Sequence, residues 1–141
     1  MLEMNATDVR KEWSSVIDSV VRDKPKLIKR TRDRMWISNL ETMVEILDGY
    51  HFTAEQFVEE DHSITLSLNE IDLVENAGTV EECKKKLAES IMEYSWEYYN
   101  NYSYWHQAPN RKKHVPYVFK ALIMDDTVKL GDSIICQNGK N

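Results

Sequence analysis

The spacing of apolar residues predicts a helix near the start of the chain. Apolar positions follow one another at intervals of four, three, one and three residues, and they are Val9, Trp13, Val16, Ile17 and Val20. This spacing places them on one face of a helix. Thr7 can cap the helix, and Lys24 ends it because the residue before a proline avoids the α region. We therefore expect a helix from about Asp8 to Arg22.

A β-hairpin and a second helix are expected next. Two short runs, Lys26–Arg30 and Met35–Ser38, flank a polar turn at Thr31–Arg34, which is typical of two strands joined by a turn. Ser38 and Glu41 form a capping box for a helix, which Gly49 can end. The apolar stripe of this helix is Leu40, Met43, Val44 and Leu47. If Met4–Ala6 is extended, the first 50 residues contain strand, helix, strand, strand and helix in that order.

Alternating apolar and polar residues predict β structure further along the chain. The apolar residues Ile64, Leu66 and Leu68 alternate with polar ones, as in a half-buried strand. Phe52–Val58 is expected to be its hairpin partner across the polar turn Glu59–Ser63, although Thr53 could instead begin a helical turn. The apolar run then continues through Ile71, Leu73 and Val74 to a turn signal at Asn76–Gly78.

Helical spacing returns after this turn. Thr79 and Glu82 form a capping box, and a stripe predicts a helix to about Asn101; its members are Cys83, Leu87, Ile91, Tyr94 and Tyr98. A basic linker, Ala108–His114, precedes another helix, with Pro116 tolerated in its first turn. The stripe of that helix is Val115, Val118, Phe119, Leu122 and Ile123. Asp125 and Asp126 break or re-cap the chain before Val128–Cys136, and Gln137–Asn141 is expected to be a frayed tail.

The formal charge changes sign along the chain. Residues 1–36 hold nine Lys/Arg and six Asp/Glu, whereas residues 40–100 hold three and fifteen. Residues 101–141 are again basic, with six Lys/Arg and three Asp/Glu. A basic N-terminal part on an acidic body suggests two tasks, the first being the binding of a polyanion. The alternative is ordinary charge scatter on a protein surface.

Composition excludes several classes of protein. The 141 residues suit one domain or two small ones, no apolar run approaches the roughly 20 residues that span a bilayer, and Met1–Met4 lacks the features of a secretory signal. Cys83 and Cys136 are too few and too isolated for a disulfide framework or a zinc knuckle. Cys83 lies on a helical stripe, where a buried reduced thiol is expected. These features favour a cytoplasmic protein that does not contact a membrane.

The sequence contains no arrangement that indicates catalysis, a metal or a cofactor. The four histidines fall in unrelated segments, without the spacing of paired metal ligands. There is no phosphate loop, dinucleotide fingerprint or nucleophile elbow. His106 lies near Arg111–His114 and could serve an RNase-like site, but such a combination arises readily by chance. We therefore expect a protein that is not an enzyme and needs no cofactor.

Residues 4–48 resemble the DNA-binding head of the Phd/YefM antitoxins. In that family an arginine early in the first helix contacts DNA, and Arg10 holds this position here. The resemblance implies that the head dimerises and presents two basic surfaces to an operator. The DNA-contacting residues that it implies are Asn5, Thr7, Arg10, Lys11, Arg30, Arg32 and Arg34. The loop between the central strands usually contains a glycine in the family, whereas Arg32–Arg34 does not, so Asp33 is expected to cap the turn.

A second resemblance covers residues 62–98. Its strands, turn and helix, with the sequence Thr79-Val80-Glu81-Glu82 at the helix start, look like the half-RNase-H-like modules of HicB-type antitoxins. Strand, turn and helix is a common unit, and this segment has no motif that carries the catalytic carboxylates of RNase H.

Aromatic residues are concentrated near the end of the long helix. Seven of the fourteen lie between Tyr94 and Trp105, more than one helical face can bury. Tyr94 and Tyr98 are expected in the core, which leaves Trp96, Tyr99 and Tyr102. Because Tyr and Trp are common interface anchors, these three are candidates for binding a partner, beside Glu93 and Glu97. Packing against another part of the chain and stacking on nucleic-acid bases are the alternatives.

Together these features predict an α+β protein in two parts. Residues 1–50 form a Phd/YefM-like dimerising head, and residues 51–141 form an acidic body with a strand pair, a long helix and C-terminal helices. The resemblance implies a bacterial type II antitoxin that neutralises a RelE-like toxin and represses its own operon by binding operator DNA as a homodimer or larger assembly. The alternative is a non-catalytic protein-interaction module that uses the head only for dimerisation.

Overall fold

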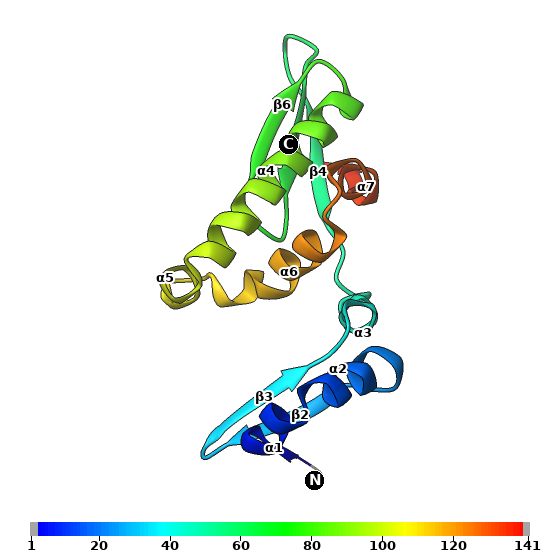
Figure 1. Ribbon diagram of the computed structural model, residues 1–141. Coiled ribbons are helices and arrows are strands. Elements are labelled where there is room, and N and C mark those ends of the chain that lie inside the picture. The colour runs from blue at the N-terminus through cyan, green and yellow to red at the C-terminus, as the bar shows by residue number, and fades with distance from the viewer. Residues whose placement is uncertain (1–2, 140–141) are drawn as a thin grey trace. The chain divides into compact units, whose positions relative to one another are not determined.

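The computed structural model describes residues 3–139 (Figure 1). Contacts within the chain define two compact units, one ending at Ile46 and the next beginning at Leu47. We refer to them as the N-terminal unit and the C-terminal unit and describe each by itself.

The N-terminal unit is a three-stranded sheet with helices packed on one face. β1 (Met4–Asn5) is parallel to β2 (Lys26–Arg30), and β3 (Asp33–Ile37) is antiparallel to β2. The helices α1 (Ala6–Lys11) and α2 (Trp13–Arg22) connect β1 to β2, and α3 (Leu40–Ile46) ends the unit. The predicted order of elements is confirmed, but the first helix is divided in two. The buried core of this unit is Val9, Val16, Val20 and Ile28.

The cap and the continuity of the first helix differ from the prediction. Asn5, not Thr7, is the N-cap, because its side-chain oxygen accepts a hydrogen bond from the Thr7 backbone N–H at 2.8 Å. At Glu12 the backbone has φ −114° and ψ 33°, so the helix stops and begins again. Val9 and Val16 keep the same apolar spacing on both sides of Glu12, which is why the pattern did not indicate this break.

The hairpin turn is tighter than predicted. β3 begins at Asp33, which pairs with Arg30, so only Thr31 and Arg32 lie between the strands. Thr31 has φ 54°, a region in which a β-branched residue is strained and glycine is not. Two-residue hairpin loops require such a positive φ. Asp33 holds this turn through an exposed ion pair with Arg30 at 3.0 Å.

The cap of α3 is also displaced by one residue from the prediction. The Thr42 backbone N–H donates to Asn39 Oδ1 at 2.9 Å, so Asn39 caps the helix and the predicted box of Ser38 and Glu41 is wrong. No residue of α3 is buried. The apolar stripe that predicted this helix therefore faces solvent over most of its length within the described residues.

The C-terminal unit is a four-stranded sheet with helices on one face (Figure 1). The strand order is β6-β5-β4-β7, formed by β4 (Thr53–Val58), β5 (Ile64–Leu68), β6 (Val74–Ala77) and β7 (Ile135–Asn138). The helices are α4 (Val80–Asn100), α5 (Tyr102–Gln107), the 3₁₀ helix η1 (Lys112–His114), α6 (Val115–Met124) and α7 (Thr127–Ser133). The α+β class and the long helix of the prediction are confirmed.

The sheet is larger than the predicted strand pair. The hairpin of β4 and β5 is confirmed, and the helical turn considered at Thr53 is wrong. Asn76 and Ala77, expected in a turn, belong to β6, and part of the expected tail forms β7, which is parallel to β4. The helix α5 was not predicted. Asp125, in the left-handed region at φ 47°, ends α6, and Asp126 caps α7, as the sequence suggested.

The apolar stripe of α4 is the centre of the core. Thr79 caps this helix, as predicted: the Glu82 backbone N–H donates to Thr79 Oγ1 at 3.2 Å. Ala54 and Leu68 lie opposite each other on β4 and β5 and both are buried, so this face of the sheet faces the helix. The fully buried members of the core are Ala54, Leu66, Cys83, Leu87, Ala88, Ile91, Tyr98, Val118, Ala121 and Leu130.

Candidate nucleic-acid and partner interfaces

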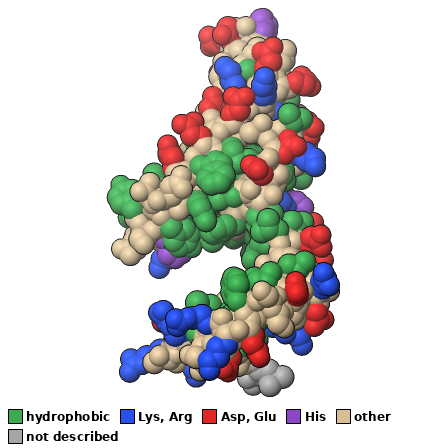
Figure 2. Space-filling model, viewed as in Figure 1, with side chains coloured by type: hydrophobic (Ala, Val, Ile, Leu, Met, Phe, Trp, Pro, Cys, Tyr) green, Lys and Arg blue, Asp and Glu red, His purple; other side chains and the backbone are tan. Residues whose placement is uncertain are grey.

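The basic residues of the N-terminal unit lie on α1 and at the end of the hairpin. Arg10 and Lys11 are exposed in the last turn of α1, and Arg30, Arg32 and Arg34 are exposed around the turn. Figure 2 shows Lys and Arg side chains gathered on the part of this unit that carries the hairpin turn. The residues that the sequence predicted for DNA binding are therefore accessible.

Charges of the same sign face each other on this hairpin. Lys29 lies directly opposite Arg34 in the antiparallel ladder, an arrangement that is unfavourable unless an anion balances it. Arg34 forms an ion pair with Glu3, and Arg30 forms one with Asp33. The Arg30–Asp33 pair is exposed on both sides and contributes little stability, whereas the Glu3 side chain of the other pair is mostly buried.

Asn5 and Thr7 were also predicted to contact DNA. Both are exposed, but the Asn5 side-chain oxygen is already used to cap α1. A role in DNA binding for these two residues stays a prediction.

The N-terminal unit exposes more large apolar side chains than it buries. Ile28 faces the helices, so its neighbour Leu27 and the cross-strand partner Trp36 lie on the other face of the sheet, where Trp36 is 48% exposed. The exposed large apolar residues of the unit are Trp13, Val21, Met35, Trp36, Leu40, Val44 and Ile46. Met35 pairs with Ile28 and therefore lies on the opposite side of the sheet from Trp36, so these residues do not all share one face.

The aromatic residues of the C-terminal unit separate into two sets, as predicted. Tyr94 and Tyr98 are buried, whereas Trp96, Tyr99 and Tyr102 are exposed. The Trp96 and Tyr99 rings contact edge to face at 6.0 Å. Glu93 and Glu97 on the same helix are exposed as well.

Phe119 of α6 completes this surface and was not recognised from the sequence. Its ring centroid lies 6.2 Å from those of Tyr99 and Tyr102. The stripe pattern of α6 placed Phe119 in the core, but the ring is only half-buried and contacts the exposed tyrosines. We call Trp96, Tyr99, Tyr102 and Phe119 the aromatic surface; Figure 2 shows hydrophobic side chains gathered over α5 and α6.

The predicted basic linker is tied to the core at its end by His114 and Arg111. The Tyr94 hydroxyl lies 2.7 Å from His114 Nδ1, and the Tyr98 hydroxyl donates to the Arg111 carbonyl at 2.8 Å. The Arg111 guanidinium lies 5.9 Å from the centroid of the Tyr94 ring and 5.8 Å from that of the Trp105 ring. These contacts fix the segment between α5 and α6, which composition alone suggested was a loop.

Burial holds His114 in its neutral form. The side chain is 1% exposed, and this burial lowers its pKa from the ordinary 6.5, with the charges of Arg111 and Lys113 acting in the same direction and Asp72 acting against them. His114 is also the N-cap of α6, where the helix dipole disfavours a cation. A neutral imidazole with its proton on Nε2 can accept a hydrogen bond from the Tyr94 hydroxyl at Nδ1.

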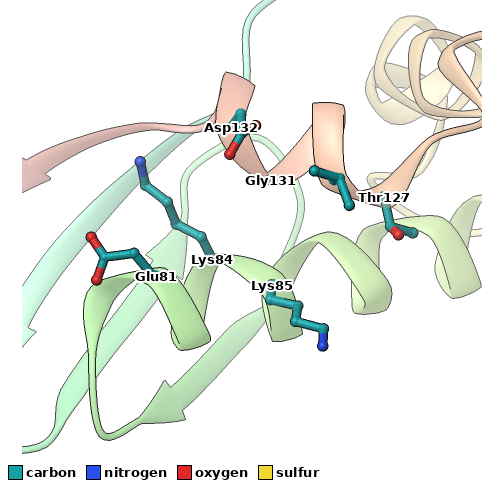
Figure 3. A pocket seen from close by; sticks show the side chains of 7 residues that line it. Glu81, Lys84, Lys85, Thr127, Gly131 and Asp132 are labelled. Atoms are coloured by element: carbon teal, nitrogen blue, oxygen red, sulfur yellow. The ribbon is translucent and has the colours of Figure 1, made fainter.

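A groove of about 350 Å³ lies between α4 and α7 (Figure 3). Its charged lining consists of Glu81, Lys84, Lys85 and Asp132, and Thr127, Val128 and Gly131 complete it. Two ammonium groups and two carboxylates balance one another, so the groove has no preference for an anion or a cation.

Within residues 3–139, no cluster of three or more His, Cys, Asp or Glu side chains could hold a metal ion. Over the same residues no helix is long and apolar enough to cross a membrane. Cys83 is a free, fully buried thiol, as predicted, and Cys136 is free and half-buried.

Comparison with known proteins identifies the class. Residues 1–135 match the PHD_like family, described as antitoxin of toxin–antitoxin, RelE/RelB, TA system, so the chain belongs to this antitoxin family. A crystal structure of the antitoxin part of a toxin/antitoxin system from Syntrophomonas wolfei subsp. wolfei is 34% identical, with a TM-score of 0.93 over 99% of this chain and 100% of that one. No curated protein matches the chain significantly. The family and the fold point to a regulatory protein rather than an enzyme.

The neutral state of His114 predicts how stability depends on pH. The unfolded chain binds a proton near pH 6.5, whereas the folded chain binds it only at a lower pH. The free energy of unfolding should therefore be highest above pH 6.5 and fall as the pH decreases from there, by at most about 1.4 kcal/mol per pH unit for this one proton.

Urea unfolding between pH 8 and pH 5 measures this dependence, with His114→Gln as the variant that cannot titrate. The slope below pH 6.5 should decrease in His114→Gln, whatever its absolute stability, and should stay unchanged in the exposed control His62→Gln. An unchanged slope in His114→Gln would show that other groups cause the acid sensitivity.

Proposed function

We propose that this antitoxin is of the Phd/YefM type. It represses its own operon by binding operator DNA as a dimer through residues 1–50. It neutralises a RelE-like toxin through the body, residues 51–141. The observation that carries the proposal is the set of exposed basic side chains on α1 and the hairpin in a chain of the antitoxin family. We place its action in the cytoplasm, where toxin, operon and antitoxin would meet.

DNA binding by this surface is supported by charge and position. The five basic residues lie in a part of the chain with nine Lys/Arg and six Asp/Glu, and all five are exposed on α1 and around the hairpin turn. Dimerisation would present two copies of this surface to the two halves of an operator, and the spacing of the copies would select the spacing of the half-sites.

Dimerisation through the N-terminal unit is supported by its exposed apolar side chains. Four buried residues form its core, and a core this small is marginal for an isolated unit of fewer than 50 residues. Trp36 on the open face of the sheet, and the half-buried Met43 on α3, are the residues that we propose for the contact between protomers.

Toxin binding by the aromatic surface is supported by the exposed Glu93 and Glu97 on the same helix as Trp96 and Tyr99, and by the acidic balance of the chain before them. Residues 40–100 carry fifteen Asp/Glu and three Lys/Arg, and a toxin that acts on RNA is expected to be basic. Opposite charges accelerate the encounter, and buried aromatic anchors slow dissociation. The alternative function, an interaction module without operator binding, would keep this surface and the dimer but not the role of Arg10.

The first prediction is that Arg10→Ala weakens binding to the DNA upstream of the gene without unfolding the protein. Each neutralised phosphate contributes a slope of about −0.9 to the logarithm of affinity against the logarithm of salt. Because a dimer carries two copies of Arg10, the slope should become shallower by about two. Fluorescence anisotropy with duplex DNA at several salt concentrations measures both quantities.

Arg22→Ala is the matched control, since Arg22 is an exposed arginine at the far end of α2. It should retain the affinity and the slope of the wild type. Equal affinities for Arg10→Ala and the wild type at moderate salt would exclude this use of α1.

The second prediction is that Trp36→Ala shifts the protein from dimer to monomer. Removing the indole from the open sheet face deletes apolar area that the partner would cover, at about 25 cal/mol per Å². Light scattering over a series of micromolar concentrations gives the mass. Trp96→Ala removes a ring of similar exposure from the C-terminal unit and should leave the mass unchanged; a monomeric wild type would overturn the dimer.

The third prediction is that Trp96→Ala combined with Tyr99→Ala releases the toxin but leaves operator binding intact. Loss of two interface anchors typically costs several kcal/mol of binding free energy. Co-purification with the basic toxin encoded beside the gene tests this. Tyr104→Ala, which removes an exposed ring outside the aromatic surface, should keep the toxin bound. Retention of the toxin by the double variant would assign the aromatic surface to packing only.

A further inference from the structure

We propose that the corner of the C-terminal unit formed by α5 and η1 binds single-stranded nucleic acid. This would be a second nucleic-acid surface, separate from the duplex-binding one proposed for the N-terminal unit. The stretch from Tyr98 to Met124 contains four Lys/Arg and no Asp/Glu, although the unit as a whole is acidic.

The corner carries two exposed rings, Tyr102 and Tyr104, beside the partly buried Trp105 and His106. Tyr104 is 71% exposed and contacts Trp105 edge to face at 5.4 Å. The Trp105 ring in turn stacks on the buried Tyr98 ring, with centroids 6.4 Å apart and ring planes inclined by 21°. The Tyr102 ring stacks on the His106 imidazole, with centroids 5.0 Å apart and ring planes inclined by 15°. A rigid exposed ring that the core does not use is a platform for a nucleic-acid base.

Two lysines lie on the element that packs against α5. Lys112 and Lys113 are exposed on η1, which packs against α5. Arg111 has a different role, because its guanidinium lies against the Tyr94 and Trp105 rings and pairs with Asp72 at 3.8 Å. The Tyr98 hydroxyl of α4 donates to the Arg111 carbonyl, so the start of η1 is held against α4. Lys112 and Lys113 are therefore the groups placed to neutralise phosphates.

The ligand class follows from the combination of rings, charges and amides. Exposed amide side chains adjoin the rings at Asn100, Asn101, Gln107 and Asn110, and amides can donate to and accept from base edges. An acidic peptide would use the lysines but would gain little from a stacking ring. A duplex hides the faces of its bases, whereas a single strand exposes them. Dependence on the Tyr104 ring therefore separates a single strand from other polyanions.

The test is fluorescence anisotropy of the full chain with labelled 12-nucleotide oligo(U) and oligo(dT). Lys112→Gln combined with Lys113→Gln should lower affinity for both strands and reduce the salt slope by about 1.4, at about 0.7 per phosphate contact in a single strand. Tyr104→Ala should lower affinity about tenfold, whereas Tyr104→Phe, which keeps the ring, should bind as the wild type does.

Matched controls separate this surface from the rest of the chain. Lys85→Gln combined with Lys129→Gln makes the same charge change at two exposed sites of the C-terminal unit and should leave binding unchanged. Arg10→Ala combined with Arg32→Ala should weaken duplex binding but not single-strand binding, so the two proposals can fail independently.

Three results would overturn the proposal. The first is single-strand binding that survives Tyr104→Ala and the Lys112 and Lys113 changes together. The second is single-strand binding that disappears with the Arg10 and Arg32 changes, which would assign it to the N-terminal unit. The third is equal binding of a labelled poly-glutamate peptide with no effect of Tyr104→Ala, which would identify an acidic protein partner.

Discussion

The apolar stripe of α4 is the contact on which the rest of the C-terminal unit depends. Cys83, Leu87 and Ile91 are fully buried along it, with the sheet beneath and α6 and α7 beside it. Strands and helices that are distant in sequence meet on this single helix, so a hairpin, two later helices and the last strand share one core. Burying the stripe also leaves the outward positions of the same helix, Trp96 and Tyr99, exposed.

The two units differ in how many of their apolar side chains they bury within the chain. The C-terminal unit buries a large apolar core and still exposes rings such as Trp96 and Tyr99, whereas the described part of the N-terminal unit buries four apolar residues and exposes others on β3 and α3. Because apolar burial is the main favourable term in folding, the small core of the N-terminal unit leaves it more dependent on any partner that covers its exposed residues. Under the proposed dimerisation, the integrity of the basic surface would therefore depend on the second protomer.

The sequence pattern predicted the features that depend on residues close together in the chain. The long helix, its Thr79 cap and the β4–β5 hairpin followed from apolar spacing and capping residues, and the separation of Tyr94 and Tyr98 from Trp96 and Tyr99 followed from helical period. Strand β7 was missed because its parallel pairing with β4 joins residues about 80 positions apart. The break at Glu12 and the shift of a cap to Asn39 were missed because neither changes the apolar pattern.

Candidate site residues were predictable where the exposure of a side chain follows from its place in a helix or turn. They were not predictable where the packing of distant helices decides that exposure. Arg10 and Arg32 lie at a helix end and in a turn, so their accessibility required no tertiary knowledge. Phe119 and Tyr104 depended on how α5 and α6 meet α4. Lys112 and Lys113 looked like part of a flexible linker because nothing in the sequence links Tyr98 to the Arg111 carbonyl. That hydrogen bond, with the ring contacts of Arg111, turns a run of basic residues into a surface with fixed geometry on the element that packs against α5.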